Sequence, residues 1–359
     1  MGKQTPLYEQ HRQAGGRIVD FGGYDMPLHY GSQLHEHRVV RAGVGMFDVS
    51  HMLVVDIIGR GACAFLRRLL ANDVATIGKG QALYTAMLNP KGGVIDDLIV
   101  YCRDEGYRLV LNCGNRDKDL SWLRQVVEKF SVTIQPRNDL SIVAVQGPEA
   151  IKKVRQALPK VDTALQQLKV FHALEFNSVF VARTGYTGEE GVEIIVPNSE
   201  VVTLWDKLLA LRVQPCGLGS RDTLRIEAGL NLYGHEMDET VSPLAANMGW
   251  TIAWDPEDRD FIGRQALATL QRQGTSQKLV GLLLEERGVL RAQQKVRTSH
   301  TSEQGVVTSG TFSPTLGQSI ALARVPNGTA EHCSVELRNK TVGVRVVAPR
   351  FVRHGRSLI

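Results

Sequence analysis

Residues 92–113 read GGVIDDLIVYCRDEGYRLVLNC, and this stretch shows how the chain builds its local structure. The runs LIVYC and RLVLNC have the composition of strands, and RDEGY between them is a turn. The NPKGG cluster just before the stretch marks another turn. Residues 116–130 then place apolar side chains at the 3.6-residue spacing of an amphipathic helix. Strands and helices are therefore expected to mix along the chain.

The same pattern continues on both sides of this stretch. Residues 34–42 predict a helix, and residues 45–59 alternate as a single strand that ends at Gly59. Residues 220–230 predict a helix capped by Ser220. From residue 278 onward short strands and turns replace the helices, which predicts a separate all-β domain. The charged stretch 255–277 is the predicted linker.

Composition narrows the class of protein. The chain has 359 residues, which favours two or three domains, with 43% hydrophobic and 22% charged residues, as in ordinary globular proteins. Its net charge is only +5, from 42 basic and 37 acidic residues, and aromatics make up 6%. A nucleic-acid-binding protein more often shows a basic stripe with interleaved aromatics, so no nucleic acid is expected. A mild positive surplus is compatible with an anionic small molecule or an acidic partner.

Cysteines and apolar runs indicate the compartment. The five cysteines are scattered and none lies in a CxxC pair, so neither a disulfide framework nor a metal site is expected. The first residues lack the apolar region of a secretory signal, and no apolar run approaches the ~18 residues of a transmembrane helix. We therefore expect no membrane association and a reducing, cytoplasmic environment.

Several common chemical motifs are missing. The chain has no GxxxxGK[ST] phosphate loop, no HExxH, no GxGxxG after a strand and no GxSxG. In GGVIDDLIVY, strand alternation places Asp96 and Asp97 on opposite faces, with Ile99 and Tyr101 on the side of Asp97. A carboxylate, an aliphatic and an aromatic side chain on one surface suit a flat heteroaromatic ligand. The alternative is that Asp97 only satisfies turn amides, as aspartates often do.

A set of longer phrases carries more information than any single motif: MFDVSHM (46–52), GGVIDDLIVY (92–101), QGP (146–148), RTGYTGEEGVE (183–193), GLGSRDTLRIEAG (217–229), LYGHEMDE (232–239) and SGTFSPTLG (309–317). In order and spacing they resemble the aminomethyltransferase family, the T-protein of glycine cleavage, over almost the whole chain. Tyr24 stands where that family often has tryptophan, at a position expected to pack. SGTFSPTLG is expected to be a structural turn between strands.

The resemblance implies a folate-dependent transferase that uses no metal. The methylene carbon would pass from an aminomethyl group on the lipoyl arm of a separate carrier protein to tetrahydrofolate, giving 5,10-methylenetetrahydrofolate and ammonia. Loss of the lipoyl thiolate would leave an iminium carbon for N5 of the folate to attack. Asp97 matches the catalytic aspartate. A carboxylate there would stabilise positive charge and hold the folate nitrogen in place.

Other matched positions imply ligand contacts. Glu193 matches a glutamate that binds the pterin edge, although it could be an ordinary strand glutamate. Arg221 matches a ligand-binding arginine, with a local salt bridge as the alternative and Arg225 as the competing candidate. Tyr84 and Asn112 match contact positions but could be buried polar residues with local partners. Ile99 and Tyr101 join the predicted folate site through the face that they share with Asp97. His51, beside Asp48 and Ser50, invites comparison with a catalytic triad, but we expect a structural histidine.

By resemblance the fold is α+β, with three domains around a central folate channel. Residues 1–51 and 140–255 would form a discontinuous folate-binding domain, residues 52–139 an inserted domain carrying Asp97, and residues 278–359 a β-barrel-like domain. Two other classes share this architecture. A folate-dependent demethylase module would be fused to a flavin-binding half, and a non-catalytic folate-binding relative acting in iron–sulfur assembly would carry a distinctive cysteine motif; neither feature is seen in the sequence.

Overall fold

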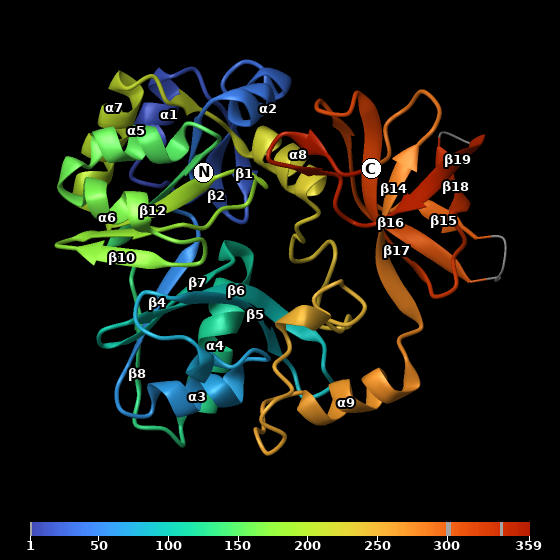
Figure 1. Ribbon diagram of the computed structural model, residues 1–359, viewed down its shortest axis with the longest axis horizontal. Coiled ribbons are helices and arrows are strands. Elements are labelled where there is room, and N and C mark those ends of the chain that lie inside the picture. The colour runs from blue at the N-terminus through green and yellow to red at the C-terminus, as the bar shows by residue number, and fades with distance from the viewer. Residues whose placement is uncertain (1, 299–302, 338–339) are drawn as a thin grey trace. The chain divides into compact units, whose positions relative to one another are not determined.

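The computed structural model describes residues 2–298, 303–337 and 340–359 (Figure 1). Contacts divide the chain into two compact units. The first unit comprises Met1–Leu66, Val74–Tyr84 and Leu98–Asp222, and the second comprises Arg67–Asp73, Thr85–Asp97 and Thr223–Ile359. The predicted boundaries of three domains stay a prediction.

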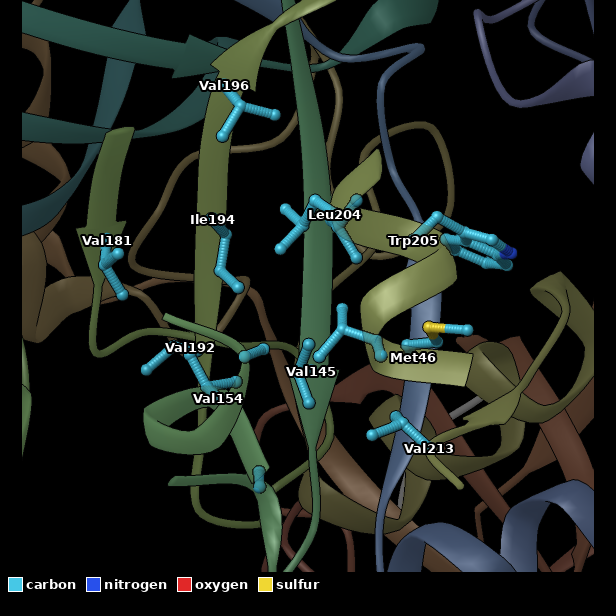
Figure 2. Packing of buried hydrophobic residues seen from close by; sticks show 14 of the residues in the cluster. Met46, Val145, Val154, Val181, Val192, Ile194, Val196, Leu204, Trp205 and Val213 are labelled. Atoms are coloured by element: carbon cyan, nitrogen blue, oxygen red, sulfur yellow. The ribbon is translucent and has the colours of Figure 1, made fainter. Parts of the chain in front are cut away.

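A six-stranded sheet in the first unit has an apolar face covered by helices. One buried cluster contains Val145 on β9, Val192 and Ile194 on β12, and Trp205 on α7. In Figure 2 the labelled side chains of β9 and β12 point to the same side of the sheet. Alternation therefore sends Glu193 to the opposite face. The strand order is β10 (Ala173–Phe176), β11 (Val179–Ala182), β12 (Gly191–Pro197), β9 (Leu140–Gln146), β3 (Gly45–Asp48) and β13 (Gln214–Pro215), and the helices are α5 (Ala150–Ala157), α6 (Asp162–Gln167) and α7 (Asn198–Ala210).

Local sequence signals explain several of the remaining elements. Gly22 and Gly23 both have positive φ, at 58° and 83°, as a tight hairpin turn between β1 (Arg17–Phe21) and β2 (Tyr24–His29) requires. The Ser32 side chain accepts a hydrogen bond from the His35 amide and so begins α2 (Gln33–Ala42). A five-stranded sheet has the order β5 (Ala82–Leu88), β6 (Val94–Arg103), β7 (Gly106–Leu111), β4 (Leu53–Ile58) and β8 (Thr133–Pro136). Further helices are α1 (Tyr8–Gln13), α3 (Ala62–Leu69) and α4 (Arg116–Val127), with 3-10 turns at Val74–Thr76, Cys113–Asn115, Pro159–Val161 and Gly249–Thr251.

The C-terminal strands form a closed barrel in the second unit, with Leu282, Val307 and Val335 fully buried inside one cluster. The turn in SGTFSPTLG joins two barrel strands, and Ser313 and Thr315 donate hydrogen bonds to the buried carboxylate of Glu227. This contact agrees with the structural role expected for the motif. The strand order is β14 (Gln277–Leu284), β17 (Gln318–Pro326), β16 (Gln304–Ser313), β15 (Lys295–Arg297), β18 (His332–Leu337) and β19 (Lys340–Val347), and a small sheet of β20 (Val352–Arg353) and β21 (Arg356–Ser357) follows.

The predicted mixture of helices and strands with a C-terminal barrel is confirmed, but two local predictions, the single strand 45–59 and the Ser220 cap, were wrong. Residues 45–59 form two strands in different sheets, because a turn at Val49–Met52 interrupts them and the Asp48 carboxylate accepts the Ser50 amide. Helix α9 (Arg264–Gln273) lies within the stretch predicted as the linker, whose place in the chain stays a prediction. Ser220 does not cap a helix, since α8 (Leu218–Ala228) begins two residues earlier and Ser220 is buried in its first turn.

Candidate functional site

A row of four residues crosses the face of the six-stranded sheet opposite the buried cluster that contains Val145 and Val192. Strand register places Ala182 opposite Glu193, Glu193 opposite Ala144, and Ala144 opposite Phe47. Because neighbouring strands lie about 4.8 Å apart, the Glu193 and Phe47 positions are separated by roughly 10 Å. Both direct neighbours of Glu193 are alanines, so no bulky cross-strand side chain crowds its carboxylate.

The Glu193 carboxylate is only partly engaged by the protein. Thr184 Oγ1 donates to Glu193 Oε2 at 2.6 Å, and the hydroxyl of Tyr101 lies 3.1 Å from the same Thr184 oxygen. Glu193 Oε1 takes no hydrogen bond from the residues that the structure describes. Tyr101 is 1% exposed, and burial raises the pKa of its hydroxyl. One carboxylate oxygen is thus fixed, and the other can accept hydrogen bonds from a ligand.

The glycine-rich segment 183–191 is held on the end of β9 by Gln146. The Gln146 amide donates to the Thr184 carbonyl at 3.2 Å and accepts from Thr187 Oγ1 at 2.8 Å. A Cβ at Gly185 or Gly191 would come within 2.1 Å or 2.4 Å of the Gln146 amide. The close contact between the backbone and the Gln146 side chain therefore requires glycine at positions 185 and 191. It fixes the loop that carries Thr184 and Tyr186.

Arg221, in the first turn of α8, lies between aromatic rings. Its guanidinium carbon is 4.9 Å from the ring centre of Tyr186 and 5.9 Å from that of Phe47. Arg221 Nη1 is buried and has no hydrogen-bond partner among the residues that the structure describes. Burial lowers the pKa of the guanidinium, while the nearby charge of Glu193 opposes this effect. Arg221 and Glu193 therefore interact electrostatically, and Arg221 keeps a donor for an acceptor that the protein does not supply.

Arg225, one turn further along α8, differs sharply from Arg221. It is 1% exposed and donates to Glu236 at 2.9 Å, to Ser309 at 2.6 Å and to the Leu230 carbonyl at 3.2 Å. Its donors are occupied by a buried ion pair and neutral acceptors. Arg221 is thus the better candidate for a ligand contact.

The remaining predicted residues occupy ordered positions on strands or at strand ends. Asp96 is fully buried, whereas Asp97 and Ile99 on β6 are partly exposed, as the predicted alternation requires. Asp97 belongs to the second unit, while Tyr84, Ile99, Tyr101 and Asn112 belong to the first. Tyr84 is half-buried on β5, and Asn112 follows β7 directly. Within the first unit the structure thus brings Tyr101, Glu193 and Arg221 to one site.

Comparison with known proteins identifies the family. Residues 7–256 match the GCVT N-terminal domain, and residues 277–353 match the Glycine cleavage T-protein C-terminal barrel domain. The crystal structure of glycine cleavage system aminomethyltransferase T from Bartonella henselae is 34% identical, covers 99% of each chain and superposes with a TM-score of 0.92. The chain belongs to the glycine cleavage T-protein family. Heterotetrameric sarcosine oxidase from Corynebacterium sp. U-96 is 13% identical over 57% of this chain and 92% of that chain, with a TM-score of only 0.37.

In this member of the T-protein family, sequence reasoning missed the residues that support the predicted contacts. Thr184 orients Glu193, Tyr186 stacks on Arg221, and Gln146 fixes the loop that carries both. The signal was present in RTGYTGEEGVE, where closely spaced glycines before a strand indicate a backbone that approaches another group tightly. The spacing of the glycines alone does not show which group the backbone approaches.

A cleft of about 230 Å³ opens in the first unit beside the β3–β4 turn. Its lining includes Lys3, Arg116 and Arg137 and no acidic side chain. Arg137 is paired with Asp56 and Asp139, so Lys3 and Arg116 supply most of the uncompensated charge. The cleft suits a negatively charged group.

No group of three or more histidine, cysteine, aspartate or glutamate side chains in the described ranges could hold a metal ion. No helix in the same ranges is long and apolar enough to cross a membrane.

Proposed function

We propose that this protein is a tetrahydrofolate-dependent aminomethyltransferase of glycine cleavage. It would take the methylene carbon from the aminomethyl-lipoyl arm of a carrier protein and deliver it to tetrahydrofolate, with release of ammonia. The observation that carries this proposal is the buried, unpartnered Nη1 of Arg221, which interacts electrostatically with the half-engaged carboxylate of Glu193. The family and a 34% identical aminomethyltransferase support the same reaction.

The chemistry of these groups fits a pterin. Glu193 can accept hydrogen bonds from the adjacent N3–H and 2-amino groups of the ring edge, and Arg221 can donate to the ring carbonyl. Arg221 and Glu193 interact electrostatically, so both can contact one small ring system. Tetrahydrofolate, when bound, supplies the N5 nitrogen that accepts the carbon. Further contacts to the same ligand are proposed for Tyr84, Ile99, Tyr101 and Asn112.

Asp97 is proposed as the catalytic residue. Its carboxylate would stabilise the positive charge that develops on the transferred aminomethyl group, and it would orient the accepting nitrogen and its proton. Asp97 is partly exposed while its neighbour Asp96 is fully buried, so of the two only Asp97 can reach a ligand without rearrangement of the strand.

The carrier protein is proposed to be acidic and lipoylated. Lys3 and Arg116 in the cleft beside the β3–β4 turn offer a positively charged docking point for such a partner. Charge complementarity of this kind mainly raises the rate of association and depends on ionic strength.

An ammonia-release assay tests the proposed function. Aminomethylated carrier is incubated with the protein, with and without tetrahydrofolate, and folate should accelerate ammonia release strongly. Asp97→Asn should retain folate binding but lower turnover by about 10²–10³, as for other preorganised electrostatic groups. Absence of folate acceleration would favour a non-catalytic folate-binding relative. Unchanged turnover in Asp97→Asn would remove the catalytic assignment of this residue.

A further inference from the structure

A chain of two hydrogen bonds ends on the carboxylate of Glu193. Thr184 Oγ1 donates to Glu193 Oε2 at 2.6 Å, and the hydroxyl oxygen of Tyr101 lies 3.1 Å from Thr184 Oγ1. A carboxylate only accepts, and the threonine hydroxyl has a single proton, which the short contact commits to Glu193. Thr184 Oγ1 can therefore only accept from its other neighbour. The Tyr101 hydroxyl is then the donor, and the chain runs in one direction from Tyr101 through Thr184 to Glu193.

Both hydroxyl donors are held in place by the surrounding protein. The Thr184 carbonyl accepts from the Gln146 amide at 3.2 Å, and the Tyr101 ring packs edge-on against Phe180, with ring centres 5.1 Å apart and an interplanar angle of 82°. Burial and the nearby charge of Glu193 raise the pKa of the Tyr101 hydroxyl, which therefore keeps its proton at physiological pH. Because Tyr101 and Thr184 are both buried, water does not compete for either hydroxyl.

The direction of the Glu193 carboxylate depends on this chain. Its direct cross-strand neighbours are Ala182 and Ala144, which offer no polar side chain. Among the residues that the structure describes, Thr184 is the one side chain that hydrogen-bonds the carboxylate, and Oε1 accepts no bond. A carboxylate that rotated freely would have to be ordered by the ligand, and that ordering would reduce the affinity. Thr184 orders Glu193 before the ligand arrives.

We propose that Thr184 and Tyr101 are positioning residues for the ligand-binding carboxylate, and that the Tyr101 hydroxyl acts on the ligand only through Thr184. This inference rests on the proposed function. It refines the contact proposed there for Tyr101, because the ring remains free to touch the ligand while the hydroxyl proton is committed to Thr184. Loss of the Thr184 hydroxyl then breaks the whole chain, whereas loss of the Tyr101 hydroxyl weakens it only at its far end.

A double-mutant cycle on the full chain tests this order of action. Tetrahydrofolate is titrated into each variant under anaerobic conditions in a calorimeter. Thr184→Val, which replaces the hydroxyl by a methyl group, should bind about tenfold more weakly, because Glu193 loses the bond that orients it. Tyr101→Phe should bind about threefold more weakly, since Thr184 still donates to Glu193. The double variant should bind like Thr184→Val alone, because the Tyr101 hydroxyl then has no partner through which to act.

Two further variants separate positioning from a purely structural role. Thr184→Ser keeps the hydroxyl and should bind within about twofold of the wild type. Thr308→Val is the matched control, since Thr308 is also buried and donates to a buried carboxylate, Glu236, at 2.6 Å in the second unit. It should lose stability in urea unfolding but keep the wild-type affinity. In the ammonia-release assay Thr184→Val should raise KM for tetrahydrofolate and keep kcat within about threefold, because Glu193 is not proposed to touch the reacting nitrogen.

The cycle can contradict the inference in several ways. A double variant that binds about thirtyfold more weakly than the wild type, the product of the two single effects, would show that Tyr101 acts independently of Thr184. Wild-type affinity in Thr184→Val, or a Thr184→Ser variant as weak as Thr184→Val, would also overturn it. If Thr184→Val does not fold, Thr184→Ala replaces it in the same cycle. A wild type that does not bind tetrahydrofolate would instead overturn the proposed function, and this inference with it.

Discussion

Arginines one turn apart on α8 allow the proposed binding site to be tested by a matched pair of substitutions. In Arg221→Lys the charge is kept, but the planar fork that reaches from Phe47 to Tyr186 is lost. The variant should lose one charge-assisted hydrogen bond to the ligand, worth about 1.5–3 kcal/mol. Tetrahydrofolate should therefore bind roughly 10- to 150-fold more weakly.

The free energy of unfolding of Arg221→Lys should fall only by the lost stacking on Tyr186 and Phe47, about 0.5–1 kcal/mol, because Nη1 makes no hydrogen bond to the residues that the structure describes. Arg225→Lys should behave in the opposite way. A single ammonium cannot replace the guanidinium contacts to Glu236, Ser309 and Leu230, so the free energy of unfolding should fall by about 2–3 kcal/mol.

The assays are calorimetric titration with tetrahydrofolate and urea unfolding, run on both variants and the wild type. Binding of tetrahydrofolate by Arg221→Lys within about threefold of the wild type would exclude Arg221 as a ligand contact. A loss of stability in Arg221→Lys as large as that in Arg225→Lys would mean that Arg221 is a structural residue.

Three further predictions concern the binding carboxylate, the buried histidine and the barrel turn. Glu193→Gln should bind tetrahydrofolate about 10- to 100-fold more weakly in the same titration, because an amide cannot accept two hydrogen bonds from the pterin edge; equal affinity would remove Glu193 from the site. The pKa of His51 in the folded protein is about 4, below its ordinary value of 6.5. Between these two pH values His51 is therefore protonated in the unfolded chain and neutral in the folded protein. Urea unfolding of the wild type should therefore lose about 2 kcal/mol more between pH 7.5 and pH 5 than that of His51→Asn, and parallel pH profiles would contradict this. Glu227→Gln should lower the unfolding free energy by about 1–3 kcal/mol, since the carboxylate that accepts from Ser313 and Thr315 is replaced by a weaker acceptor, and a thermal melt identical to the wild type would refute it.

Much of the fold could be predicted because its signals are local. The period of 3.6 residues in α4 and the alternation in β9 and β12 depend on nearby residues only, and the structure has these elements. The break between β3 and β4 could not be predicted in this way. No glycine or proline marks the break between Gly45 and Gly59, and the turn depends on the side chain of Asp48, which is buried by residues far away in sequence.

Only those residues of the candidate site that match a motif of the family could be predicted from the sequence. Glu193 and Arg221 came from the resemblance, and periodicity gave only the face of the strand on which Glu193 lies. The difference between Arg221 and Arg225 is a matter of partners, since Glu236 and Ser309 lie 11 and 84 residues away from Arg225. Spacing along one helix cannot reveal which arginine has its donors occupied.

The row across the six-stranded sheet makes the site sensitive to errors in folding. Ala144 lies between Glu193 and Phe47 because β9 pairs in one register, and the adjacent residues on β9 are Val143 and Val145, which belong to the helix-covered core. A slip of one residue would exchange these faces and put a valine between Glu193 and Phe47. A refolded preparation could then have nearly all of its secondary structure and still contain molecules that do not bind the ligand. The fraction of active sites, measured by titration, would report the register of this strand more sensitively than circular dichroism.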